Sequence, residues 1–307
     1  MIYKLFLFSN NLVMYSSVLK IILIVLLVVS EKIIAEEKRV ICSDLLQDPL
    51  SRYLEKQLTD SSKWNIQFKG SYIGLQMLES NEADMGILAL KSDQRKDLEV
   101  NPNYLVLPFA FQTFFIGVNT ANDIREIKVD VLKDIFSNDG MDQFSGWGDI
   151  NSNFQDNILS DIYVLLASER IGIGNQLFKA EVLEGENYNI KATVVESHQE
   201  LSIIVSSNPN SLALFTKKPR SEKIRILSIT PSKSNYAFSP SRQNLFYSDY
   251  PYYLSFMVVC RKGKVKNFKE LCQILYSNDF FEEIETEGFI GLPIIEQKKI
   301  LSSYFGL

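Results

Sequence analysis

The chain has 307 residues, of which 46% are hydrophobic and 22% are charged, and its formal net charge is −5 at pH 7. This length and composition suit a globular protein with one large domain or two lobes. A nucleic-acid-binding protein would be expected to carry a dense basic run, and KKPRSEKIR at 217–225 is the nearest segment of that kind. We interpret this segment as a solvated turn between two strands, so we expect no nucleic-acid partner.

The first 35 residues are typical of a secretory signal peptide. VLKIILIVLLVVS at 18–30 is apolar but shorter than a full membrane span, and EKIIA then leads into the charged EEKR. We therefore expect cleavage after Ala35 and a periplasmic protein. An uncleaved N-terminal anchor is the alternative, and a start at Met14 would give a more ordinary signal peptide.

The first part of the mature chain alternates short apolar runs with helical periodicity. We expect strands at 39–43, 65–70 and 83–90, and helices at 44–58 and 71–80. The segment 104–119 is long, apolar and aromatic. Because Pro108 lacks a backbone donor, it favours two strands or a crossing segment over one central strand.

The second part repeats this alternation around a loop at 137–160. We expect helices at 129–136, 172–183, 198–208, 265–277 and 280–287, and strands at 161–168, 191–197, 211–216, 223–229 and 250–260. The pattern predicts an α/β fold in which each lobe is a mostly parallel sheet flanked by helices. Two crossover segments would join a first lobe, 36–115 with 250–307, to a second lobe at 116–249.

Titratable and nucleophilic side chains offer little for catalysis. Three cysteines are an odd number for an exported protein, and we interpret them as buried free thiols, with a Cys260–Cys272 bond as the alternative. The single histidine, His198, excludes a His-rich metal site, and we expect it at the surface. No hydrolase or nucleotide-binding motif is present, so we expect neither an enzyme nor a cofactor.

Three predicted helix starts carry small or polar residues directly after a strand. The first N–H groups of a helix lack intrahelical partners, and ligands of open α/β sheets bind at the carboxyl ends of the strands. The candidate ligand-binding residues are Ser43, Asp44, Ser71, Gly172, Gly174 and Asn175, with Arg170 as a bidentate partner for an oxyanion. Plain helix caps and a solvent-facing arginine are the alternatives, and Asp84 is expected to make a buried polar contact.

Several segments resemble the type 2 periplasmic solute-binding proteins, and within them the phosphate-binding subunit of phosphate ABC transporters. FKGSYIGLQMLESNEADMGILAL at 68–90 resembles the stretch in which Gly-Ser-Gly opens a helix and an Ala-Asp-Ile/Phe-Gly strand follows, with Tyr72 in place of the second glycine. The segment 107–150 resembles the crossing strand of the family and the residues after it, through Val118-Asn119 and Trp147. ERIGIGNQLF at 169–178 resembles the arginine and Gly-Ser-Gly-Thr motif. The likeness extends over nearly all of 38–295.

The resemblance implies a two-lobed fold that closes on a small oxyanion, with phosphate as the first candidate, and delivers it as a monomer to an inner-membrane ABC permease. It matches Ser43 and Ser71 with hydroxyl donors and Arg170 with the binding arginine. In the glycine turn at 172–175 two of the family's hydroxyl residues are replaced, and the register of the turn stays open. Ala89 stands where the family carries a polar pair whose acid accepts the proton of hydrogen phosphate. A sensory or interaction module with a degenerate pocket is the alternative.

Overall fold

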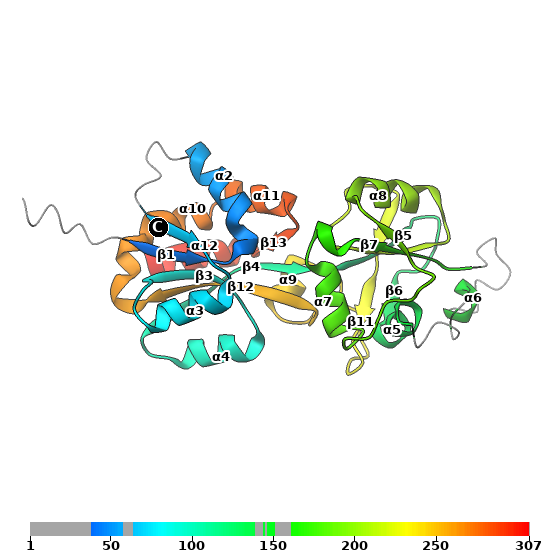
Figure 1. The fold of residues 1–307 in the computed structure, drawn as a ribbon, viewed down its shortest axis with the longest axis horizontal. Coiled ribbons are helices and arrows are strands. Elements are labelled where there is room, and N and C mark those ends of the chain that lie inside the picture. The colour runs from blue at the N-terminus through cyan, green and yellow to red at the C-terminus, as the bar shows by residue number, and fades with distance from the viewer. Residues whose placement is uncertain (1–37, 58–63, 139–143, 145, 151–160, 307) are drawn as a thin grey trace, which may run out of the picture.

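The structure, a computed structural model, describes residues 38–57, 64–138, 144, 146–150 and 161–306. The predicted signal peptide and most of the 137–160 loop lie outside these residues. In the described ranges, no helix is both long and apolar enough to cross a membrane. Two lobes stand side by side, each built around its own sheet (Figure 1).

The first sheet has six strands in the order β13-β4-β12-β3-β1-β2. These strands are β1 (Arg39–Cys42), β2 (Asn65–Phe68), β3 (Met85–Leu90), β4 (Tyr104–Thr113), β12 (Tyr253–Arg261) and β13 (Phe289–Gly291). Its helices are η1 (Asp44–Leu46), α2 (Gln47–Gln57), α3 (Ser71–Glu79), α4 (Ser92–Val100), η5 (Lys262–Phe268), α10 (Lys269–Leu275), α11 (Asn278–Thr286) and α12 (Ile294–Phe305). Almost every residue of β3 is buried, as expected for an inner strand covered on both faces.

The second sheet has five strands in the order β10-β5-β9-β7-β8. These are β5 (Phe115–Asn119), β7 (Tyr163–Ala167), β8 (Thr193–Val195), β9 (Ser211–Phe215) and β10 (Ile224–Ile226). Its helices are α5 (Val129–Phe136), α6 (Trp147–Ile150), η4 (Glu169–Ile171), α7 (Gly174–Glu181) and α8 (His198–Ser207), while α9 (Arg242–Phe246) precedes β12. A small parallel pair, β6 (Glu126–Lys128) with β11 (Ser228–Thr230), lies beside it.

The predicted two-lobed α/β fold is confirmed, but each sheet is mixed where we expected a mostly parallel one. β1 pairs parallel with β2 and β3, and β7 pairs parallel with β8 and β9. β4, β12 and β13 join antiparallel in the first sheet, as do β5 and β10 in the second. Each antiparallel pair involves a strand next to a crossing between the lobes: β4 leaves the first lobe, β12 returns to it, and β5 enters the second.

The segment 104–119 forms two strands, as predicted, but the break is at Phe114 and not at Pro108. Opposite Pro108 the register shifts, since Phe256 of β12 pairs with Ala110 and Met257 with Pro108. Phe109 is therefore the extra residue of a β-bulge, a position that tolerates a residue without an N–H donor. β4 ends at Thr113, and the chain enters the second sheet at Phe115.

The two crossings between the lobes pack against each other through aromatic rings. The ring centroid of Phe114 lies 5.0 Å from that of Phe178 on α7 and 5.9 Å from that of Tyr252 on the returning chain. The Thr113 hydroxyl donates to the Tyr252 carbonyl at 2.5 Å. β4 and β12 run together from one lobe toward the other, with α7 beside them (Figure 1). The hydrophobic core is therefore continuous across the border between the lobes.

All three cysteines are free and buried, so the interpretation as buried thiols is confirmed and the Cys260–Cys272 bond does not form. Burial raises the pKa of Cys260 to about 12 and raises the pKa of Cys42 and of Cys272 further. Asp84 is also buried and pairs with Arg39 at 3.2 Å, which is the buried polar contact expected for it.

Candidate functional site

The candidate residues of the first lobe lie side by side at the carboxyl edge of its parallel strands. β1 ends one residue before Ser43, and β2 runs beside it in register, with Cys42 opposite Phe68. A Cβ added to Gly70 would lie 3.8 Å from Asp44 Oδ1, so the two turns are in contact. Gly70 has φ +75°, a left-handed conformation that glycine adopts without steric cost. Ser43 is buried, whereas Asp44 is exposed.

The hydroxyl of Ser71 ties the start of α3 to the end of β3. It accepts a hydrogen bond from the N–H of Ala89 at 2.8 Å, and its own hydrogen remains as a donor. The first intrahelical bond of α3 runs from the N–H of Gly74 to the carbonyl of Gly70, so the N–H groups of residues 71–73 precede that ladder. Tyr72 is 70% exposed beside them.

The glycine turn of the second lobe packs against the ends of two strands. Gly172 follows η4 with φ +148°, and its added Cβ would lie 2.6 Å from Thr216 Oγ1. Gly174 opens α7, and its Cβ would come within 2.9 Å of the Thr216 Cα and 3.1 Å of the Thr113 carbonyl oxygen. Both positions therefore need glycine because other chain segments approach the backbone closely.

Thr216 and His198 hold this turn in place. Thr216 Oγ1 donates to the Ile171 carbonyl at 3.0 Å, and His198 Nε2 lies 3.0 Å from the same carbonyl and 3.1 Å from Thr216 Oγ1. A carbonyl only accepts, so the proton belongs on Nε2. Burial lowers the pKa of His198 below its ordinary value; the hydrogen bond to the Ile171 carbonyl opposes this shift, and the charge of Lys217 adds to it. Our expectation of a surface histidine is wrong, because the ring is half-buried against the turn.

The side chains of Asn175 and Arg170, the other candidate residues near this turn, differ in burial. The Asn175 amide is buried, donates to the Ala167 carbonyl at 2.5 Å and accepts from the Tyr188 hydroxyl. Its side chain is therefore engaged within the second lobe. Arg170 is exposed, and among the described residues its side chain makes no ion pair. It lines a hollow of about 460 Å³ together with Tyr188.

A second hollow, of about 600 Å³, lies between the lobes and carries positive charge. Lys91, Arg95 and Lys96 line it from the first lobe, and Glu181 of α7 lines it from the second. Lys91 and Lys96 are exposed. Neither Ser71 nor Gly172 lines this hollow, but Lys91 follows two residues after Ala89, whose N–H bonds Ser71. Cations beside the turns would raise the local concentration of an anionic solute.

An ion network connects the lobes near the glycine turn. Lys217, two residues after β9, contacts Glu287 of the first lobe at 2.9 Å, and Arg52 contacts the same carboxylate at 2.5 Å. Hydrogen bonds from Arg52 and Lys217 lower the pKa of Glu287. Gly288, with φ +90°, makes room for Lys217, whose Cγ would lie 2.8 Å from an added Cβ.

Sequence reasoning missed Thr216, His198 and Lys217 as neighbours of the glycine turn. His198 and Lys217 directly follow the strands predicted at 191–197 and 211–216, and Thr216 is the last residue of the second of these. The carboxyl ends of parallel strands share one edge of the sheet. That rule could have placed these three residues beside the glycine turn. Among the described residues, no group of three or more His, Cys, Asp or Glu side chains could hold a metal ion.

No protein-family model matches the chain, and no curated protein matches its sequence. Solved structures do match its fold. A possible phosphate-binding protein from Planctomyces limnophilus superposes with a TM-score of 0.65 at 16% identity, over 89% of this chain and 98% of that one.

Two further solved structures also match the fold of this chain. PstS from Borrelia burgdorferi gives a TM-score of 0.59 at 16% identity, over 84% of this chain and all of that one. An ABC-type phosphate transport receptor from Vibrio cholerae gives 0.51 at 18% identity, with 84% and 100% covered. The chain therefore has the two-lobed α/β fold found in these substrate-binding proteins.

Proposed function

We propose that the protein is an exported, periplasmic solute-binding protein that captures a small oxyanion between its lobes, with phosphate as the first candidate. The observation that supports this most is the pair of turns at the carboxyl edges of the two sheets. In each, a glycine that tolerates close approach lies next to the first N–H groups of a helix of eight or more residues, α3 and α7. Such N–H groups and the helix dipole favour an anion.

Binding would use dipoles and hydroxyls from both lobes, and no bond would be made or broken. The N–H groups of residues 71–73 and 174–176 precede the first intrahelical bonds of their helices. The Ser71 hydroxyl adds a donor, and Ser43, Asp44 and Arg170 remain proposed contacts. A solute that touches both lobes stabilises the closed arrangement, because only that arrangement provides all its contacts.

We also propose the partners and boundaries that the resemblance implies. The protein would act as a monomer and deliver its solute to an inner-membrane ABC permease, without a cofactor. Its lobes would comprise 36–115 with 250–307, and 116–249. The matching proteins are named for phosphate, which supports that solute here by fold similarity alone.

Calorimetric titration with phosphate, sulfate and molybdate tests the proposal. We expect saturable phosphate binding that Ser71→Ala weakens about 10- to 150-fold, since a hydrogen bond to a charged group contributes about 1.5–3 kcal/mol. Ser71→Thr, which keeps the hydroxyl, should restore most of the affinity. Ser302→Ala on the exposed face of α12 is the matched control and should bind like the natural protein. Phosphate affinity that is equal in all three variants would refute the role of Ser71.

A non-transport sensory or interaction module is the second candidate. Tyr72 is 70% exposed at the start of α3, Ala89 uses its N–H to bond Ser71, and Asn175 is engaged internally. These features fit a pocket that has lost anion affinity. A folded protein that binds none of the three anions would support this candidate over the first.

A further inference from the structure

A basic loop that the proposed function leaves unused separates two further hollows. The segment 217–221, which we had interpreted only as a solvated turn, connects β9 to β10. Lys218, Pro219, Arg220 and Glu285 line both hollows, whose volumes are about 650 and 660 Å³. The two hollows therefore adjoin at this loop, and we call the pair of them the groove.

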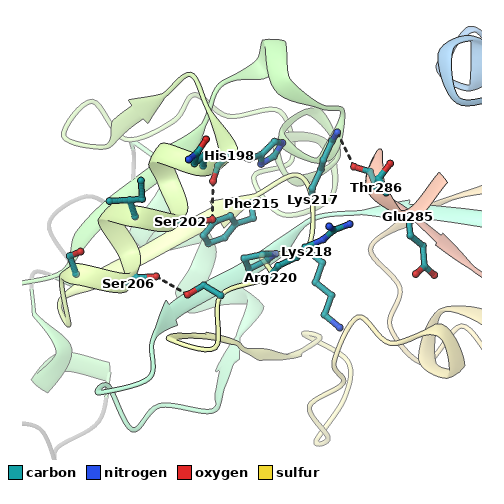
Figure 2. A pocket seen from close by; sticks show the side chains of 14 residues that line it. His198, Ser202, Ser206, Phe215, Lys217, Lys218, Arg220, Glu285 and Thr286 are labelled. Carbon is teal, nitrogen blue, oxygen red and sulfur yellow. Dashed lines mark hydrogen bonds between the residues drawn. The ribbon is translucent and has the colours of Figure 1, made fainter. Parts of the chain in front are cut away.

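Both lobes contribute walls to this groove. Figure 2 shows α8 with Ser202 and Ser206 on one side and Glu285 with Thr286 on the other, with Lys218 and Arg220 between them. Ser206 hydrogen-bonds Ser221 at 3.0 Å, which fixes the loop against α8. A bound molecule would thus touch side chains from both lobes.

The charge of the groove is positive although the protein is acidic overall. Lys217 is paired with Glu287 and Arg242 with Glu285. Lys218 and Arg220 are exposed, and neither makes an ion pair within the described residues. Two cations are thus left to face an anionic ligand, against a chain net charge of −5.

Size and chemistry narrow the class of ligand. Hollows of 300–1,000 Å³ accommodate organic molecules rather than single ions. A guanidinium binds phosphate oxygens in a bidentate manner, a lysine adds a point charge, and serine hydroxyls suit sugar or phosphate oxygens. Because the groove is concave and has walls from two lobes, it suits a small molecule better than it suits the flat surface of a partner protein.

We propose that this groove binds a small organic molecule with at least two phosphate groups, at a site separate from the glycine turns. The proposal goes beyond the solute-binding function and does not depend on it. Because both lobes would contact the ligand, its binding would also bias their relative arrangement.

Calorimetry with fructose 1,6-bisphosphate as the probe tests this site on the full chain. The titration is done at low salt in saturating inorganic phosphate, which keeps any phosphate site at the turns filled. We expect saturable one-to-one binding that weakens at least tenfold in the double variant Lys218→Ala/Arg220→Ala and also weakens as salt is raised. Inorganic phosphate affinity should be unchanged in that variant.

The double variant Arg125→Ala/Lys233→Ala is the matched control, because it removes the same two charges from exposed positions of the same lobe outside the groove. It should bind the bisphosphate like the natural protein. An absence of saturable bisphosphate binding, or an equal loss in the two double variants, would overturn the proposal. Either result is independent of whether inorganic phosphate binds, so the two proposals fail separately.

Discussion

Substituting Gly174 by alanine should strain the contact between the glycine turn and both neighbouring strands. The added methyl group would lie 2.9 Å from the Thr216 Cα and 3.1 Å from the Thr113 carbonyl oxygen. Both are backbone atoms, so no flexible side chain can move aside. Overpacking of this kind costs about 1–3 kcal/mol. For a protein of this size that corresponds to a melting temperature about 2–12 °C lower, at roughly 2–4 °C per kcal/mol.

Gly263→Ala is the matched control for this prediction. An added Cβ there has no heavy atom within 4 Å, and Gly263 is not among the glycines with positive φ. Its substitution should leave stability unchanged or raise it by about 0.4–1 kcal/mol, through the smaller entropy of the unfolded chain. Urea denaturation and thermal melting of both variants give the comparison. If Gly174→Ala were as stable as Gly263→Ala, the close approach of Thr216 and Thr113 to this turn would be refuted.

Three further outcomes are expected. Asn175→Ala should cost about 1–3 kcal/mol in urea denaturation, because it removes the amide that donates to the buried Ala167 carbonyl, whereas the Tyr188 hydroxyl keeps its bond to the backbone carbonyl of residue 175; a cost within error of zero would contradict the structure. Glu287→Gln should lower the melting temperature at pH 7, and this difference should shrink as the pH falls below 4.5. The folded-state pKa is depressed below that ordinary value, so the stabilisation by the carboxylate is lost as the pH falls through the folded value. A melting-temperature difference that does not shrink in acid would contradict this. A thiol reagent at pH 8 should label the three cysteines slowly in the folded protein, because they are buried, and rapidly in urea. Fast labelling of the folded protein would show that the thiols are accessible.

The local signals of the sequence predict most of the strands and the helix starts after them. The expected helix at 71–80 is α3, and the expected strand at 83–90 contains β3, because alternation of helical and apolar runs is a property of neighbouring residues. The helices α4 and α12 were not predicted. Among the described side chains of α4 Leu98 alone is buried, so the helix lacks the apolar stripe from which a helix is recognised.

The neighbours of the candidate site could not be predicted in the same way. Strand direction depends on pairing between segments that are distant in the sequence, and the Thr216 hydroxyl that lies against the glycine turn bonds Ile171 across 45 residues. A histidine at a helix start has the same local sequence whether it faces solvent or, like His198, an adjacent turn. Residue types after a strand indicate where a site can lie, whereas the contacts that shape it are set by tertiary packing.

The aromatic contact of Phe114 with Phe178 and Tyr252 has a consequence for motion between the halves of the molecule. These packed rings oppose a sliding movement of one lobe against the other, because a lateral displacement would open voids in a densely packed interior. A tilt about the single residue that joins β4 to β5 disturbs them least. Opening should therefore be a hinge rotation in which the facing edges of the two lobes keep their alignment, and the proposed solute binding would then need no realignment of the lobes between one solute and the next.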